Sequence, residues 1–320
     1  MKKLSTERIF TKPINLLLLS VLCTLLWGSA YPCIKTGYVL FALPGDDIPG
    51  KLLFAGVRFF AAGIITIVIS SLQNKRFVIP DVTTRKGILF VSLTQTVLEY
   101  IFFYISMSNT TGVKGSILNS SSSFFVVILA HIFYKNDKIT MNKLAGCIIG
   151  FIGIIMINKT GLTASAFHFN MMGDGMMLLA GLAFAIGSII SKKVCQTADA
   201  MVVTGYQLGL GGLILIILGL FTGGRLTRIT PAGILLLSYM ALLSAMAFSI
   251  WTALGKYNQM SKIAIYNFLT PIFGALLSAL FLGDALFTLN NILALLLVSS
   301  GIGIVNLRSG IKPRNLRYPD

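Results

Sequence analysis

The sequence predicts an all-α membrane protein with ten transmembrane helices, arranged as two inverted five-helix repeats. The 320-residue chain is 55% hydrophobic and only 11% charged, whereas a soluble domain is about 25% charged. Its apolar residues form runs of about 17 to 25 residues, the length that crosses a bilayer as a helix. The polar connectors between these runs are too short for a soluble domain. A match between the two halves of the chain predicts the repeat.

Ten apolar windows define the predicted helices, with boundaries known to within about 2 to 4 residues. The windows are 14–37, 51–72, 86–107, 113–134, 141–158, 172–191, 201–221, 231–254, 262–282 and 289–307. Turn-forming residues separate them, as at Pro44-Gly45-Asp46-Asp47 and Gly283-Asp284. A cleaved signal peptide is the alternative for the first window, because Lys2 and Lys3 precede an apolar run that ends at the small residues Gly28-Ser29-Ala30.

The charge of the chain predicts its orientation. There are 26 Lys and Arg residues against 10 Asp and Glu, a net charge of +16, which in a soluble chain would suggest an acidic partner such as nucleic acid. With ten spans both ends share a side, and 19 of the 26 basic residues fall on that side. Because cytoplasmic loops are enriched in Lys and Arg, both termini are predicted in the cytoplasm, in a multi-pass protein of the cytoplasmic (inner) membrane with no nucleic-acid partner.

The chain matches itself at a shift of 148 residues, which aligns the fourth and fifth windows with the ninth and tenth. Shifts of about 157 and 149 align the first two windows with the sixth and seventh. Matched pairs include Lys35 with Lys192, Gly63 with Gly212, Lys114 with Lys262, Asn119 with Asn267 and Gly153 with Gly301. We therefore predict two five-span units, 14–158 and 172–307. An odd number of spans inverts the second unit, a geometry that secondary transporters use for alternating access around a midplane site.

Several segments of the chain resemble one family. They are Leu25-Leu26-Trp27-Gly28-Ser29-Ala30, Gly56-Val57-Arg58-Phe59-Phe60, Leu269-Thr270-Pro271-Ile272-Phe273, Leu282-Gly283-Asp284 and Gly301-Ile302-Gly303-Ile304-Val305-Asn306. In these segments the chain resembles the EamA-type members of the drug/metabolite transporter superfamily. The resemblance implies ten helices, two EamA units and transport of small solutes such as amino acids or other metabolites, often outward. The first copy departs from the pattern, with Ser123 opposite Pro271 and Lys135-Asn136-Asp137 in place of the Gly-acid turn.

Two ionisable residues inside predicted spans are the main candidates for a solute site. Glu99 lies near the centre of the third window, where an ionised group costs about 2.5 to 3.5 kcal/mol. It is a candidate proton-coupling group or hook for an ammonium group, the alternative being a structural hydrogen bond to a neighbouring helix. Arg58 is a candidate for binding a solute carboxylate or for pairing with Glu99. Its alternative is a stem that reaches the headgroup region.

Amide, hydroxyl and aromatic side chains complete the candidate substrate-binding site. Asn119 and Asn267 occupy matched positions, with Ser122 nearby, so an inverted repeat would bring them together near the midplane. Gln95 shares a helical face with Glu99. The aromatic candidates are Trp27, Tyr31, Tyr206 and Trp251. Interfacial belts, helix packing and interhelical hydrogen bonds are the alternatives for all these residues.

Motifs for catalysis, metals and cofactors are missing from the sequence. The four cysteines show no CxxC pairing, and neither a P-loop nor a GxSxG elbow is present. We therefore predict no enzyme activity and no cofactor. The predicted function is a secondary transporter that exports a small metabolite, an amino acid or related solute, with protons as the candidate coupling ion. An uptake permease for a small nutrient or vitamin is the first alternative, and a membrane enzyme or lipid-handling protein is the second, disfavoured one.

Overall fold

Helices make up the computed structural model, which describes residues 2–110, 115, 118–157, 169–282 and 289–306; no strand occurs within these ranges. The all-α prediction is therefore confirmed for this part of the chain. The helices are α1 (Lys2–Thr11), α2 (Pro13–Leu40), α3 (Ile48–Asn74), α4 (Val82–Ser92), α5 (Glu99–Asn109), α7 (Ser122–Phe133), α8 (Met141–Ile157), α9 (Met176–Val194), α10 (Ala200–Phe221), α11 (Pro231–Tyr257), α12 (Met260–Ala264), α13 (Leu269–Leu282) and α14 (Leu289–Asn306).

Short π and 3-10 turns extend several of these helices. The π-helical turn η1 (Leu93–Leu98) joins α4 to α5, and a second, η4 (Met171–Gly175), leads into α9. A 3-10 turn, η5 (Ile265–Phe268), joins α12 to α13. Every predicted window thus contains helix, although Lys114 and the Gly283-Asp284 turn lie outside the described residues.

Six helical segments are long and apolar enough to cross a membrane. They are Pro13–Leu40, Ile48–Asn74, Val82–Asn109, Met171–Val194, Ala200–Phe221 and Pro231–Tyr257. Shorter apolar helices lie at Ser122–Phe133, Met141–Met156 and Leu295–Val305. The chain is therefore a polytopic membrane protein. That it crosses the membrane ten times remains a prediction.

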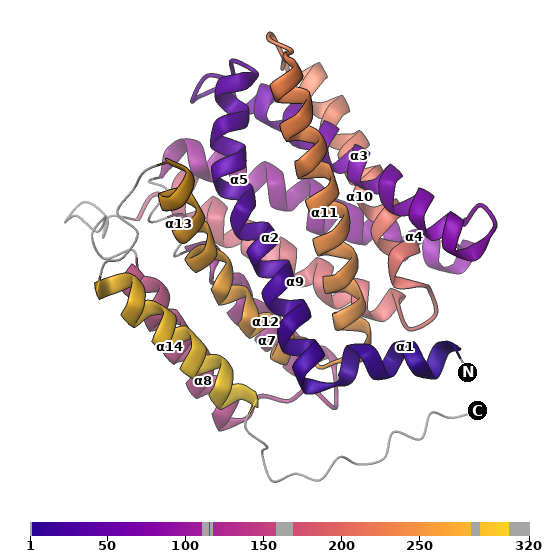
Figure 1. Ribbon diagram of the computed structural model, residues 1–320, viewed down its shortest axis with the longest axis vertical. Helices are drawn as coiled ribbons and strands as arrows, with labels where there is room; N and C mark the ends of the chain where they lie inside the picture. Colours follow the sequence, from indigo (N-terminus) through magenta and orange to yellow (C-terminus); the bar gives the residue numbers. More distant parts are fainter. Residues whose placement is uncertain (1, 111–114, 116–117, 158–168, 283–288, 307–320) are drawn as a thin grey trace.

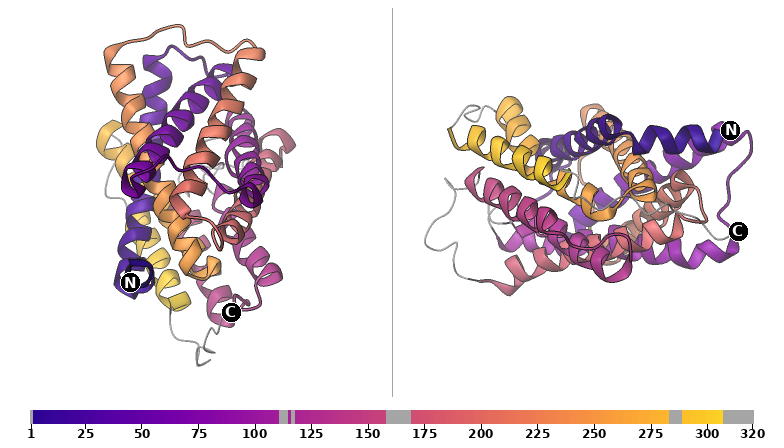
Figure 2. Two further views of the ribbon diagram at one scale, coloured as in Figure 1. Left: turned by 90° about the vertical axis from the view of Figure 1, so that its right-hand side faces the viewer. Right: turned by 90° about the horizontal axis from the view of Figure 1, so that it is seen from below.

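The two halves of the chain, residues 14–158 and 172–307, pack against each other through several pairs of helices. Three helices of the first half contact helices of the second half: α3 packs on α10, α8 packs on α14, and α2 packs on both α13 and α11. Helix α9 of the second half packs on both α7 and α5 of the first half. Like α2, it therefore contacts two helices of the opposite half. Figures 1 and 2 show α8 and α14 side by side along one side of the bundle.

Glycines allow the close approach of α3 and α10. A Cβ atom added at Gly212 would stand 2.2 Å from the backbone nitrogen of Phe60, and one added at Gly63 would stand 2.3 Å from the nitrogen of Gly209. Helices in membranes commonly approach through small residues, which let backbones touch. The close contact between α3 and α10, called the α3–α10 seam below, therefore depends on glycine, which has no side chain, at these positions.

The helix α1 lies across one end of the bundle, beside the end of α11 (Figure 1). The ring of Phe10 stacks on Tyr257 with centroids 5.7 Å apart. The side-chain amide of Asn258, the residue that follows α11, donates a hydrogen bond to the carbonyl oxygen of Phe10 at 3.0 Å. These contacts tie α1 to the point where α11 ends.

Candidate functional site

A row of aromatic rings joins α11, α2, α3 and α5 inside the bundle. The ring centroids of Trp251 and Trp27 are 5.0 Å apart, and those of Trp27 and Phe248 are 5.4 Å apart. The row continues from Phe248 to Phe59 at 6.1 Å and from Phe59 to Tyr100 at 4.5 Å. Helices from both halves contribute to it, so the row crosses the interface between them.

Both tryptophans keep a hydrogen-bond donor free within this row. The indole nitrogens of Trp27 and Trp251 are buried, and neither has a hydrogen-bond partner among the described residues. A buried indole N–H group usually finds a partner. Two donors at adjacent rings are therefore available to a polar solute.

The carboxylate of Glu99 lies beside the aromatic row. Glu99 is the first residue of α5, directly after the π-helical turn η1. One of its oxygens, Oε2, is buried without a hydrogen-bond partner in the described part of the chain. The carboxylate is close enough to the hydroxyl groups of Tyr31 and Tyr100 to interact with them electrostatically. Phenol groups from two helices, α2 and α5, thus lie near this acid, and π turns such as the one before it are frequent at functional sites.

The guanidinium of Arg58 lies deep in the bundle. Arg58 is only 2% exposed, so its side chain does not extend to the headgroup region. Its Nε donates a hydrogen bond to Ser244 Oγ at 2.8 Å, and its Cζ lies 4.9 Å from the ring centroid of Phe59. The predicted pairing of Arg58 with Glu99 is wrong: both residues are described, and they form no ion pair with each other.

The matched asparagines occupy one region of the site but do not bond to each other. Asn119 is hydrogen-bonded to the hydroxyl group of Tyr31. Asn267, on the 3-10 turn η5, donates to Ser122 Oγ at 3.4 Å and accepts from Thr270 at 3.0 Å. These bonds link α7 to the start of α13 and link α2 to the segment before α7.

Gln95 borders a small cavity that leads away from the aromatic row. Its amide nitrogen donates to Ser188 Oγ at 3.1 Å, while its amide oxygen has no partner among the described residues. Trp251 and Lys192 line the same cavity. Its volume is about 10 Å³, close to the space that one water molecule needs. The cavity therefore continues the site toward the end of α9.

Tyr206 does not belong to this cluster. Its hydroxyl group donates to the carbonyl oxygen of Val78 at 3.0 Å, and its ring packs against a buried cluster that includes Cys195 and that Phe10 of α1 also contacts. Tyr206 thus lies near α1, at an end of the bundle, and helps to hold the segment before α4.

Sequence reasoning missed three residues that contact the candidate site. Ser244 accepts the Arg58 hydrogen bond, while Phe248 and Phe59 carry the aromatic row. A signal for two of them was present, because Ser244, Phe248 and Trp251 follow one another on α11 at spacings of four and three residues and therefore share a helical face.

Comparison with known proteins gives one consistent result. The model of the EamA-like transporter family matches residues 14–159 and again 171–307. The chain is 24% identical to "Uncharacterized transporter YvbV" of Bacillus subtilis, over 91% of this chain and 92% of that protein. It is 25% identical to "Probable amino-acid metabolite efflux pump" of Salmonella typhimurium, over 84% of this chain and 87% of the pump. A solved structure titled "Crystal structure of protein" shares the fold, with a TM-score of 0.73 at 14% identity over 92% of this chain and 98% of that one.

Proposed function

Because the chain belongs to the EamA-like transporter family, we propose that it is a secondary carrier that exports a small amino acid or a related metabolite by alternating access. The protein is a multi-pass membrane protein. In the proposal it crosses the cytoplasmic (inner) membrane ten times, as two inverted five-helix units at 14–158 and 172–307, with both termini in the cytoplasm. Protons are the proposed coupling ion.

The exchange of partners between the halves supports the inverted repeat. Under the repeat, α2 corresponds to α9, α13 to α7 and α11 to α5. The contacts of α2 with α13 and α11 then have exact counterparts in the contacts of α9 with α7 and α5. In the pairs α3–α10 and α8–α14, each helix contacts its own counterpart in the other half. Two units related by a two-fold axis in the membrane plane produce this pattern.

The observation that carries the function is a pair of ionisable groups inside the bundle that do not pair: the side chain of Arg58 is buried, and so is one carboxyl oxygen of Glu99. Glu99 and Arg58 both approach Tyr100, yet they do not pair with each other. A buried charge without a counter-charge is costly, so such groups in a membrane protein generally face a solute path or a partner. A solute with a cationic and an anionic group offsets both costs at once.

The proposed binding residues divide between the two charged groups and the aromatic row. Arg58 has further guanidinium N–H groups beyond the one bonded to Ser244, which suit the two oxygens of a solute carboxylate. Glu99 and Tyr31 receive the cationic end. The rings and the amide and hydroxyl groups complete the site: Trp27, Trp251, Gln95, Asn119, Ser122 and Asn267. Tyr206 is left out, because its hydroxyl group is bonded at the end of the bundle.

Reconstituted vesicles test this proposal. The purified protein in proteoliposomes is expected to exchange an internal solute for the same labelled solute outside, without chemical conversion, when a panel of amino acids and related metabolites is screened. A gradient-driven assay with imposed pH steps then gives the direction and the coupling ion. Absence of exchange across the panel overturns the amino-acid proposal, uptake driven by the physiological gradient favours the permease, and product formation favours an enzyme.

A further inference from the structure

A lysine joins two helices at one end of the bundle. The ammonium group of Lys192, near the end of α9, donates hydrogen bonds to the carbonyl oxygens of Gly255 at 3.0 Å and of Asn258. Both acceptors lie at the end of α11, where the last carbonyl groups of a helix lack helical partners and carry partial negative charge. The same ammonium group lies 5.4 Å from the ring centroid of Tyr134. Lys192 therefore joins α9 to α11 at this end.

Further contacts at this end close the gap around Lys192. The carboxylate of Asp137 accepts hydrogen bonds from Lys143 at 2.7 Å and from the backbone nitrogen of Ser261 at 3.1 Å. Gln259 donates to the carbonyl oxygen of Asn136 at 2.6 Å. The small cavity with Gln95 and Trp251 lies directly inside this closure. Lys192 thus stands between the aromatic row and one side of the membrane.

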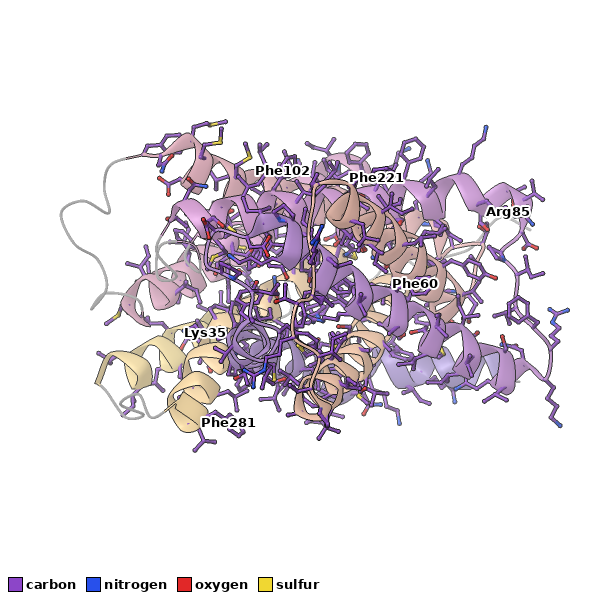
Figure 3. All side chains as sticks on the ribbon, turned by 90° about the horizontal axis from the view of Figure 1, so that it is seen from above. Lys35, Phe60, Arg85, Phe102, Phe221 and Phe281 are labelled. Carbon is purple, nitrogen blue, oxygen red and sulfur yellow. The ribbon has the colours of Figure 1, made fainter. Side chains whose placement is uncertain are left out.

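The repeat places Lys35 opposite Lys192, and the two lysines differ in their surroundings. Lys35 is exposed, and the described part of the chain offers it no hydrogen bond or ion pair. Figure 3 views the end of the bundle where Lys35 lies. On α2 it follows Tyr31 by four residues, so it shares a helical face with the candidate site. At this end α2 and α5 are joined by a hydrogen bond between the hydroxyl groups of Tyr38 and Tyr104, but within the described residues no lysine binds the end of α5 as Lys192 binds the end of α11.

The ends of α5 and α11 are equivalent in both sequence register and backbone conformation. The 148-residue shift places Gly255 on Met107 and Asn258 on Thr110. Asn258 ends α11 with φ −127° and ψ 170°, and Thr110 ends α5 with φ −140° and ψ 164°. The carbonyl groups that Lys192 binds at the end of α11 therefore have counterparts at the end of α5.

We propose that Lys192 and Lys35 are alternating latches that determine which side of the membrane the site faces. Lys192 holds α9 to the end of α11 in the present state. In the opposite state Lys192 releases, and Lys35 donates to the carbonyl oxygens of Met107 and Thr110, which draws α2 to the end of α5. The inference rests on the proposed carrier function and on the proposed repeat.

Distance measurement between the ends of α2 and α5 tests the latches. Val39 is 74% exposed and Asn109 is exposed, so cysteines at these positions carry spin labels in a chain whose four native cysteines are replaced by alanine. Pulsed electron paramagnetic resonance then gives the distribution of distances. Lys192→Met is expected to raise the ratio of short to long distances about tenfold, as expected when a charged hydrogen bond is lost. Lys192→Arg keeps a donor and should stay near the unsubstituted chain.

Matched variants decide the outcome. Lys193→Met removes an exposed charge beside Lys192 and should leave the distribution unchanged. Adding Lys35→Met to Lys192→Met should abolish the short distance. A Lys192→Met distribution equal to that of Lys193→Met overturns the proposal, and so does a short distance that persists in the double variant. Exchange in vesicles is measured on the same variants, so transport without a distance shift refutes the latches alone, and a shift without transport refutes the carrier function alone.

Discussion

Trp27 of α2 and Trp251 of α11 pack edge to face with ring centroids 5.0 Å apart, and both indole nitrogens lack a hydrogen-bond partner among the described residues. The chain contains two tryptophans in all. Its tryptophan emission therefore comes entirely from the candidate site.

Solute binding is expected to change this emission. A transported solute should give a saturable change in tryptophan fluorescence, because it approaches one or both indole N–H groups. Titration of the detergent-purified protein checks this, with Trp251→Phe and Trp27→Phe each retaining part of the signal. An analogue that is not transported should give no change. A transported solute that leaves the emission of all three proteins unaltered would place the binding site elsewhere.

Removing the charge of Glu99 should weaken coupled transport. Glu99→Gln keeps the size of the side chain but cannot take up or release a proton, so proton-linked transport should fall about a hundredfold or more, the range that a general acid–base group contributes. Transport is measured in vesicles across a series of pH values. Glu7→Gln, at an exposed position of α1, is the matched control. Unchanged rates at every pH would end the coupling role of Glu99.

Arg58→Lys should discriminate between solutes. Lysine is a point charge that cannot keep the hydrogen bond to Ser244 and also present a planar fork to a carboxylate. Anionic and zwitterionic solutes should therefore lose about tenfold or more in apparent affinity, and neutral solutes less. Competition assays against one labelled solute measure both classes. An equal loss for all solutes would instead assign Arg58 a structural part.

The glycine seam gives a stability prediction with an internal control. Gly212→Ala places a methyl group 2.2 Å from the backbone of Phe60, so α3 and α10 must separate at a cost of about 1–3 kcal/mol. Gly209→Ala, one turn earlier on α10, meets its nearest atom only at 4.0 Å and should be tolerated. Thermal unfolding in detergent compares the two. Equal melting temperatures for Gly212→Ala and Gly209→Ala would mean that α3 and α10 accommodate the added methyl group without loss of stability, which would contradict the prediction.

Cys195 should make the protein sensitive to alkali. Burial raises the pKa of its thiol from 9.0 to about 12, although Lys256 and a bond to Ser191 act in the opposite direction. The unfolded chain loses this proton first, so the thiol's contribution is intact below about pH 9. It then declines by about 1.4 kcal/mol per pH unit up to the pKa of about 12 in the folded protein. Cys195→Ala should show a shallower alkaline slope in pH-dependent unfolding. Superimposable curves for both proteins would refute this account.

Helix positions were predictable because hydrophobic length marks them, and α3 and α10 begin and end within about three residues of their windows. The π turn at Leu93–Leu98 was not, since a shift in the hydrogen-bond ladder leaves no mark on hydropathy. The helix faces that turn toward the candidate site could be predicted only in part from the sequence. Trp27 and Trp251 were identified as candidates. Ser244 and Phe248 share the helical face of Trp251, but the packing of α11 on α2 and α3 decides that this face turns inward.

Two placements that the sequence could not predict have the same physical origin. The depth of Tyr206 and Arg58 along their helices says nothing about which helix lies next to them. Tyr206 meets the carbonyl oxygen of Val78, and Arg58 meets Ser244 of α11 rather than Glu99. Tertiary packing decides which helices are neighbours, and the hydrophobic periodicity of one segment does not predict that packing.

The interleaved packing of the halves has a consequence for synthesis. The ribosome releases α3 and α8 long before α10 and α14 exist, so the glycine face of α3 and that of α8 first meet lipid rather than their partners. Neither half can complete its own seams, and assembly waits for the last helix to enter the membrane. Chains that end after the first half should therefore be recognised as incomplete and degraded, because both seams stay open.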